Sequence, residues 1–131
     1  MAFRYLRDPL FLFCVALYGI NRLVLKPVFS AAFFHNNLND LICISIWVPV
    51  MLWLMRKVGA RPDDAPPRAH EIVLPLVVWS WVFEVWLPRA AAFSQVAHAD
   101  VFDVLCYAAG TCLAAGFWKL WYRKARHKAA T

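Results

Sequence analysis

Residues 100–110 read DVFDVLCYAAG, and they lead into an uncharged run that continues to Trp118. Two aspartates, Asp100 and Asp103, therefore stand at the start of a strongly apolar helix. One interpretation is that they cap the helix, because the helix dipole favours negative charge at the amino end. The other is that they belong to a polar site at the end of a membrane-spanning helix. The rest of the chain favours the second interpretation.

Composition is typical of a membrane protein rather than a soluble domain. Hydrophobic residues make up 63% of the 131 residues and charged residues 17%, against about 45–50% and about 25% in soluble domains. The net charge of +6 does not indicate nucleic-acid binding, because the basic residues flank apolar runs, where they act as topology signals. The length fits one domain.

Four apolar segments are each close to the ~20 residues that a membrane-spanning helix needs. They are 9–28, 38–55, 72–88 and 101–121. None has the continuous polar face of a soluble amphipathic helix. We therefore predict an all-α polytopic membrane protein, in which a single four-helix transmembrane bundle covers residues 1–131 and a basic cytoplasmic tail occupies 122–131. The first segment has no clear cleavage site before Arg22 and Lys26, which indicates an uncleaved span rather than a signal peptide.

The Lys and Arg residues are distributed unevenly around these segments. Eleven fall at the amino end, in the 56–71 loop and in the carboxyl-terminal region, whereas three fall on the other side: Arg22, Lys26 and Arg89. The positive-inside rule then places both termini and the 56–71 loop in the cytoplasm. Four acids lie among these cytoplasmic basic residues, and we interpret them as solvated or capping groups: Asp8, Asp63, Asp64 and Glu71.

The remaining acids gather at the outer ends of the predicted spans. The uncharged runs 41–55 and 104–118 hold fifteen residues each, which cover only ~22 Å of helix, less than the ~30 Å hydrocarbon core. In the third segment the run is shorter still, so we expect Glu84 below the outer lipid boundary, and Asp40 and Asp103 close to it. A charge facing lipid costs about 2.5–3.5 kcal/mol at the centre of a span, so these acids should face the interior and find partners.

Nine side chains make up the predicted ligand-binding pocket at this outer end. They are Arg22, His35, Asn39, Asp40, Glu84, Arg89, Asp100, Asp103 and Tyr107. The spacing of Asp100, Asp103 and Tyr107 puts them on one helical face, and either arginine would clamp a carboxylate in a bidentate pair. The alternative is structural: Asp100 or Asp103, and Asn39 or Asp40, cap two helices, while Glu84 pairs with an arginine.

Small residues recur on the last segment, where Gly110/Ala114 and Cys112/Gly116 form two small-xxx-small pairs. Such pairs allow close helix packing, either inside the chain or across a homodimer. The cysteine spacing matches no zinc pattern, and no metal site or cofactor is predicted.

The segment FEVWLPRAAAFSQVAHADVFDVLCYAAG, residues 83–110, resembles the third-to-fourth-helix pattern of VanZ-like membrane proteins. Glu84, Arg89, Asp103 and Gly110 match that pattern in order, and HNNLND at 35–40 is similar to the polar start of the family's preceding helix. The resemblance implies a small multi-spanning protein of the cell envelope, in the bacterial cytoplasmic membrane.

Two functions from different classes follow. In the first, the outer pocket binds a membrane lipid head group or an amphipathic envelope ligand, without catalysis. In the second, the chain is an intramembrane hydrolase or transferase on a lipid-linked substrate, with Glu84 and Asp103 as a general acid/base pair. No nucleophile motif accompanies these acids, so the first is preferred. A proton path would need acids spread through the membrane, whereas these gather at one end.

Overall fold

Helices account for nearly all of the chain that the structure describes, and this part contains no strand. The computed structural model describes residues 2–31, 33–86, 89 and 101–128. The main helices are α1 Pro9–Ile20, α3 Leu38–Lys57, α4 Ala69–Trp81 and α6 Val101–Lys128. Shorter elements are the 3-10 turn η1 Tyr5–Arg7, the helix α2 Lys26–Val28, and the π-helical turns η2 Asn21–Leu25, η3 Phe33–Asn37 and η4 Val82–Trp86. The all-α prediction is confirmed for the described residues.

Local sequence explains where several helices begin and end. The Asp8 carboxylate accepts hydrogen bonds from the backbone N–H groups of Leu10 and Phe11, at 3.1 and 3.2 Å, and Pro9 starts the helix. This is a capped amino end. Helix α3 ends at Lys57, and two residues later Gly59 has a φ of 78°, in the left-handed region that glycine adopts without strain.

Among the residues that the structure describes, three helices are long and apolar enough to cross a membrane: Pro9–Val28, Phe33–Lys57 and Phe102–Lys124. The first agrees with the predicted segment 9–28. The second begins earlier than predicted, because η3 runs directly into α3. The third predicted segment, 72–88, corresponds to α4 with 13 residues, continued by η4, and residues 87–88 lie outside the described part.

Helix α6 continues through Lys128, so the described residues of the predicted tail at 122–131 belong to this helix. The physical reason is packing: Tyr122 lies one turn beyond Trp118, and both side chains are almost completely buried. The predicted boundary followed the charges of the tail, of which Arg123 and Lys124 are exposed on the helix that Tyr122 anchors.

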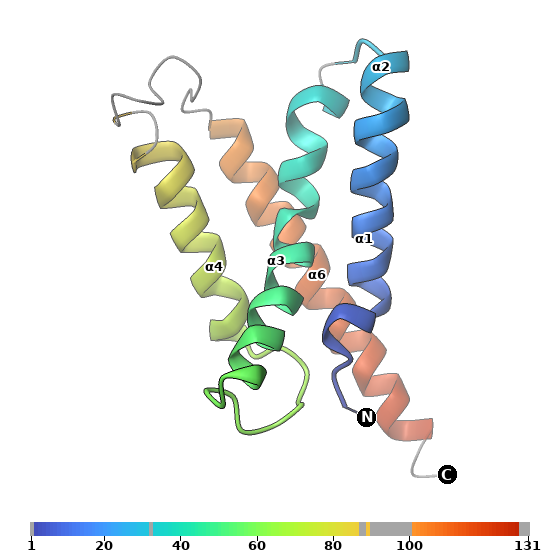
Figure 1. The fold of residues 1–131 in the computed structure, drawn as a ribbon, viewed down its shortest axis with the longest axis vertical. Helices are drawn as coiled ribbons and strands as arrows, with labels where there is room; N and C mark the ends of the chain where they lie inside the picture. Colours follow the sequence, from blue (N-terminus) through green and yellow to red (C-terminus); the bar gives the residue numbers. More distant parts are fainter. Residues whose placement is uncertain (1, 32, 87–88, 90–100, 129–131) are drawn as a thin grey trace.

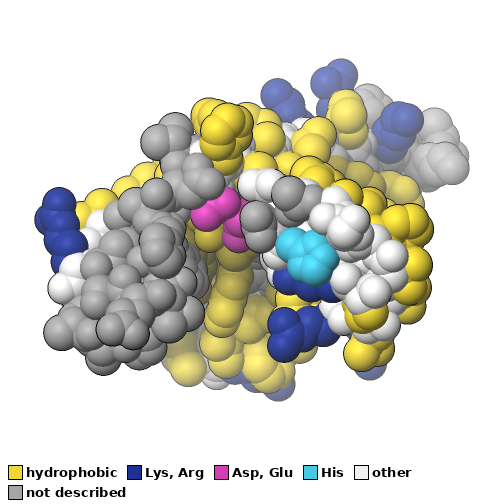
Figure 2. Space-filling view, turned by 90° about the horizontal axis from the view of Figure 1, so that it is seen from above, with side chains coloured by type: hydrophobic (Ala, Val, Ile, Leu, Met, Phe, Trp, Pro, Cys, Tyr) yellow, Lys and Arg dark blue, Asp and Glu magenta, His cyan; other side chains and the backbone are white. Residues whose placement is uncertain are grey.

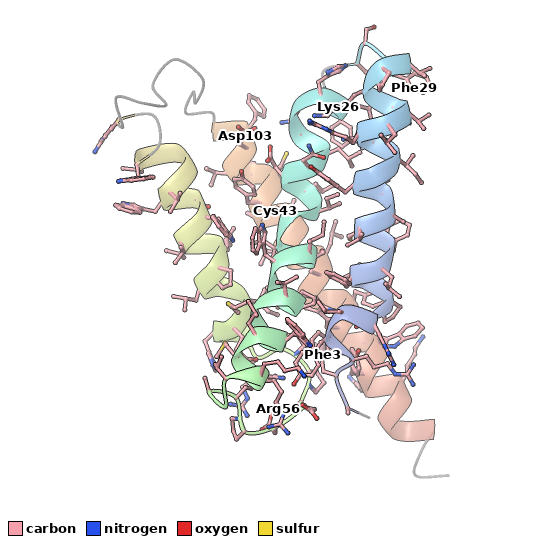
Figure 3. All side chains as sticks on the ribbon, in the orientation of Figure 1. Phe3, Lys26, Phe29, Cys43, Arg56 and Asp103 are labelled. Atoms are coloured by element: carbon pink, nitrogen blue, oxygen red, sulfur yellow. The ribbon has the colours of Figure 1, made fainter. Side chains whose placement is uncertain are left out.

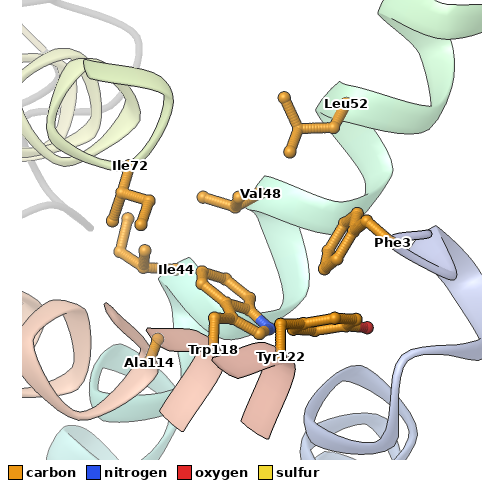
Figure 4. Close-up of a cluster of buried hydrophobic side chains, with 8 residues drawn as sticks. All are labelled: Phe3, Ile44, Val48, Leu52, Ile72, Ala114, Trp118 and Tyr122. Carbon is orange, nitrogen blue, oxygen red and sulfur yellow. The ribbon is translucent and has the colours of Figure 1, made fainter. Parts of the chain in front are cut away.

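The hydrophobic core joins α3, α4, α6 and the amino-terminal segment near one end of the molecule, and Leu10 of α1 packs against it. Eight side chains form it: Phe3, Ile44, Val48, Leu52, Ile72, Ala114, Trp118 and Tyr122 (Figure 4). Phe3 enters from the amino-terminal segment and packs edge-on against Trp118, with ring centroids 6.0 Å apart. Many large apolar side chains are exposed on the described helices, more than a monomeric soluble domain usually leaves in contiguous patches.

The two ends of the molecule differ in construction. Figure 1 shows both termini at the same end as the connection between α3 and α4. We call this the loop end, defined by residues 2–8, 58–68 and 118–128. The three π turns lie at the opposite end, which we call the π-turn end, defined by 21–25, 33–40, 82–86 and 101–107.

Candidate functional site

Asp40, Asp103 and Tyr107 come together at the π-turn end. Asp40 lies in the first turn of α3 and Asp103 in the first turn of α6. The phenol of Tyr107, which is 5% exposed, hydrogen bonds the Asp40 carboxylate and lies within electrostatic range of Asp103 and Cys43. Figure 2 shows acidic side chains in the centre of this end, and Figure 3 shows Asp103 and Cys43 on facing parts of α6 and α3.

A close crossing of α3 and α6 sets this geometry. Gly110 lies on the buried side of α6 and packs against the backbone of Leu41, and a Cβ at this position would overlap the Leu41 carbonyl oxygen. Because Leu41 follows Asp40 and Gly110 lies one turn after Tyr107, the crossing holds the phenol against the carboxylate. Glycine is required here for the approach of two backbones, not for its own conformation.

The same crossing decides how the small residues of α6 are used. Gly110 and Ala114 are buried within the chain, whereas Cys112 and Gly116 lie on exposed positions. The two pairs therefore occupy different faces, and only Cys112 and Gly116 are available to a second copy. A homodimer through all four residues is not compatible with this packing, and the dimer stays a proposal for the Cys112/Gly116 face.

Asn21 and Asn39 form a second polar contact at the π-turn end. The Asn21 side chain, fully buried in η2, donates from Nδ2 to the Phe34 carbonyl oxygen at 3.0 Å and to Asn39 Oδ1 at 3.1 Å. Its own Oδ1 meets no hydrogen-bond donor among the described residues. A buried acceptor in this state is costly, at about 1–3 kcal/mol, and such groups mark strained or ligand-binding positions.

The capping alternative is not realised at α3. Its N-cap is Asn37, without a side-chain cap hydrogen bond, whereas Asn39 contacts Asn21 and Asp40 contacts Tyr107. At α6 the comparison stays open, because Asp103 lies in the first turn and Asp100 lies outside the described residues.

The remaining predicted residues are placed as follows. His35 lies in η3 and contacts the preceding segment: its Nε2 lies 3.1 Å from the Phe29 carbonyl oxygen, and Lys26 Nζ donates to the His35 carbonyl oxygen at 2.9 Å. Arg22 and Arg89 are exposed. Glu84 belongs to η4, but its side chain lies outside the described part of the chain.

Sequence reasoning missed a buried polar cluster at the loop end. Arg61 and Glu71 form an ion pair, with Nε and Oε1 3.0 Å apart and side chains only 1% and 6% exposed. Arg61 also donates to Tyr5 Oη and to the Ala65 carbonyl oxygen. The capping interpretation of Glu71 is right, since its carboxylate accepts from the Arg68 N–H at 2.7 Å. Its solvation is wrong, because the 58–68 loop folds back over the helix ends and covers it.

The charges of this cluster reinforce one another. Burial alone would raise the pKa of Glu71, but hydrogen bonds from Arg61 and from the Arg68 N–H outweigh it and hold that pKa below its ordinary value. Burial would lower the pKa of Arg61, but its bonds to Glu71 and Tyr5 raise it. Burial, followed by the hydrogen bond to Asp64, raises the pKa of Tyr5.

Asp8 ties the amino-terminal segment to the end of α6. Besides its two cap bonds, its carboxylate accepts from Trp118 Nε1 at 3.0 Å and from Tyr122 Oη at 2.7 Å, and it is fully buried. The capping interpretation of Asp8 is right and its solvation is wrong. A signal for this contact exists in the sequence: Trp118 and Tyr122 place two donors at i and i+4 on one face.

The fold defines a class only broadly: in its described part the protein is all-helical, and three of the helices there match membrane spans in length and composition. No protein-family model, curated protein or solved structure matches the chain.

Proposed function

We propose that this chain is an integral membrane protein of the cell envelope, VanZ-like in plan, with four spans in the bacterial cytoplasmic membrane. The exposed apolar faces and three helices of spanning length support this proposal. The fourth span begins at Ile72 in α4, after Glu71, and continues through η4. Both termini and the 58–68 loop are cytoplasmic, because the loop end carries the excess of Lys and Arg.

The proposed activity is binding, at the extracytoplasmic π-turn end, of the head group of an envelope lipid or amphipathic ligand. The observation that carries it is the convergence of Asp40, Tyr107 and Asp103 at the first turns of α3 and α6. Two carboxylates held at a helix crossing accept hydrogen bonds from the hydroxyl or ammonium groups of a head group. Arg22 and Arg89, exposed at the same end, would meet its phosphate.

Two further observations support a ligand at this end rather than simple capping. The three π turns of the described residues all lie there. Such turns are rare in proteins overall, and those that occur are often found at functional sites. The buried Asn21 Oδ1, an acceptor without a donor in the described part, lies there too.

The test is a comparison of co-purifying lipids. Asp40→Asn and Asp103→Asn should weaken binding of the native ligand roughly tenfold, because a hydrogen bond to a charged group contributes about 1.5–3 kcal/mol. An asparagine at 40 still accepts from Tyr107, so the fold should persist. Native mass spectrometry would measure which lipids stay bound, and a thermal shift with membrane lipid extract would measure both the stability of the fold and its protection by lipid.

Asp63→Asn is the matched control, because Asp63 pairs with Arg68 at the exposed loop end. If all three variants retain the same lipids and the same thermal protection, head-group binding at the π-turn end is wrong. A hydrolase or transferase that uses Glu84 and Asp103 stays the alternative from the sequence. It predicts a new lipid product whose formation Asp103→Asn abolishes.

A further inference from the structure

A second, apolar feature lies between α3 and α4, on the loop-end half of the molecule. It is a groove of about 430 Å³ lined by ten apolar side chains, from Trp47 to Val58 on one wall and from Leu74 to Trp79 on the other. Leu54, Leu74 and Val78 are about half exposed or more, so the groove is open along its length. Trp47 and Trp79, with ring centroids 5.0 Å apart, close it at the end nearer the middle of the molecule.

The length of the groove matches one leaflet of a bilayer. Trp47 and Val58 are eleven residues apart, which is ~16 Å of helix, about half of the ~30 Å hydrocarbon core. A helix from a second copy would cross the whole core and would need a groove of twice this length. A lipid acyl chain, which ends near the bilayer midplane, fits this length.

The mouth of the groove is positively charged. Arg56 and Lys57 form the last turn of α3, next to Val58. Arg56 pairs with Asp64 at 2.9 Å, whereas no carboxylate of the described residues lies within ion-pair distance of the exposed Lys57 ammonium. Lys57 instead lies 5.8 Å from the centre of the Trp53 ring, at the level where a lipid phosphate would meet it.

We propose that this groove binds one acyl chain of an anionic phospholipid from the loop-end leaflet, with the lipid phosphate on Lys57. Met51 and Met55 in the wall supply flexible side chains that adapt to a chain of variable shape. The inference rests on the proposed membrane placement, but it is independent of head-group binding at the π-turn end.

The test uses two neighbouring positions on α4. Val78 lines the groove, whereas Val77, which is 58% exposed, does not. Val78→Trp should weaken binding of phosphatidylglycerol roughly tenfold, because the larger side chain displaces several methylene groups of the acyl chain. Val77→Trp should bind as the wild type does. Native mass spectrometry of the detergent-purified protein with added phosphatidylglycerol or phosphatidylcholine measures this.

The head group is tested at the mouth. Lys57→Gln should reduce the preference for phosphatidylglycerol over phosphatidylcholine about fivefold, since one lysine near an anionic lipid contributes about 1 kcal/mol. Lys119→Gln, an exposed lysine on α6, is the control and should leave the preference intact.

Equal binding by Val78→Trp and Val77→Trp would overturn the proposal, as would a wild-type protein with no lipid preference. A dimer that Val78→Trp disrupts would assign the groove to a second copy instead and would also overturn it. Failure of the membrane placement is distinguishable, because alkaline carbonate would then release the protein from membranes without detergent.

Discussion

The loop end and the π-turn end handle their buried polar groups in opposite ways. At the loop end, Asp8 accepts four hydrogen bonds and Arg61 is paired with Glu71. At the π-turn end, Asn21 keeps a buried acceptor without a donor in the described part, and two aspartates lie around one phenol. A satisfied network stabilises one arrangement, whereas an unsatisfied group costs stability. The loop end therefore holds the helices together, whereas the buried acceptor of Asn21 at the π-turn end is a group that the proposed ligand could satisfy.

The largest effect is expected from breaking the buried ion pair of the loop end. Glu71→Ala leaves the Arg61 guanidinium buried without its carboxylate, and this should lower the free energy of unfolding by about 3 kcal/mol. Thermal or denaturant unfolding of the detergent-purified protein measures the loss.

Asp63→Ala is the control for this change, because the Arg68–Asp63 pair is nearly half exposed. It should cost less than about 1 kcal/mol, as exposed pairs do. Equal losses of unfolding free energy in Glu71→Ala and Asp63→Ala would mean that burial of the Arg61–Glu71 pair does not add to stability.

The second largest effect concerns the crossing beneath the π-turn end. Gly110→Ala forces α6 away from the backbone of Leu41 and should cost about 2 kcal/mol, within the range for overpacked contacts. It should also weaken lipid binding at the π-turn end, because Tyr107 moves with α6 relative to Asp40.

Gly116→Ala is the matched control, since a Cβ at Gly116 meets nothing within 4 Å. It should raise stability by up to about 1 kcal/mol, because alanine is the better helix former. A Gly110→Ala variant as stable as Gly116→Ala would contradict the close backbone crossing.

Local patterns account for the parts of the fold that the sequence predicts correctly. The start of the first span at residue 9 follows from the cap at Asp8 and from Pro9, and the all-α class follows from long apolar runs. The alternating direction of the predicted spans places Asp40 and Asp103 at one end, and they do lie at one end. Such inferences need only residues within a few turns of one another.

The parts that the sequence did not predict depend on contacts between distant residues. Asp8 meets Trp118 across 110 positions of the chain, and nothing near Asp8 indicates a buried partner. Arg61 and Glu71 lie in a proline-rich segment typical of an exposed loop, and they become buried only because this loop packs over the ends of the helices. The close contact of Gly110 was expected, but whether inside the chain or in a dimer depended on which helix faces it.

A smaller effect is expected from pH, and it tests the loop end alone. The pKa of Glu71 is lower in the folded state than the ~4.3 of an unperturbed glutamate. The ion pair therefore contributes its full stability above the unfolded pKa, and this contribution is lost as pH falls through the folded pKa. Glu71→Gln should flatten the fall in melting temperature of the purified protein between neutral pH and about pH 3. If the melting temperature of Glu71→Gln falls with pH as that of the wild type does, Glu71 does not contribute to the loss of stability in acid.

The smallest change in stability is expected at Asn21, and it separates the two ends most sharply. Asn21→Leu removes two hydrogen bonds from the π-turn end, but it also removes the buried Oδ1 that lacks a donor in the described part. These contributions oppose each other, so the free energy of unfolding should change by less than about 1 kcal/mol.

Asp8→Asn at the loop end introduces an N–H₂ group among donors and should lower the free energy of unfolding by about 2 kcal/mol. Lipid binding should respond in the reverse order, with Asn21→Leu weakening head-group binding and Asp8→Asn leaving it intact in the folded protein. If Asn21→Leu instead destabilises the protein as much as Asp8→Asn, both ends serve stability, and the polar groups of the π-turn end are structural.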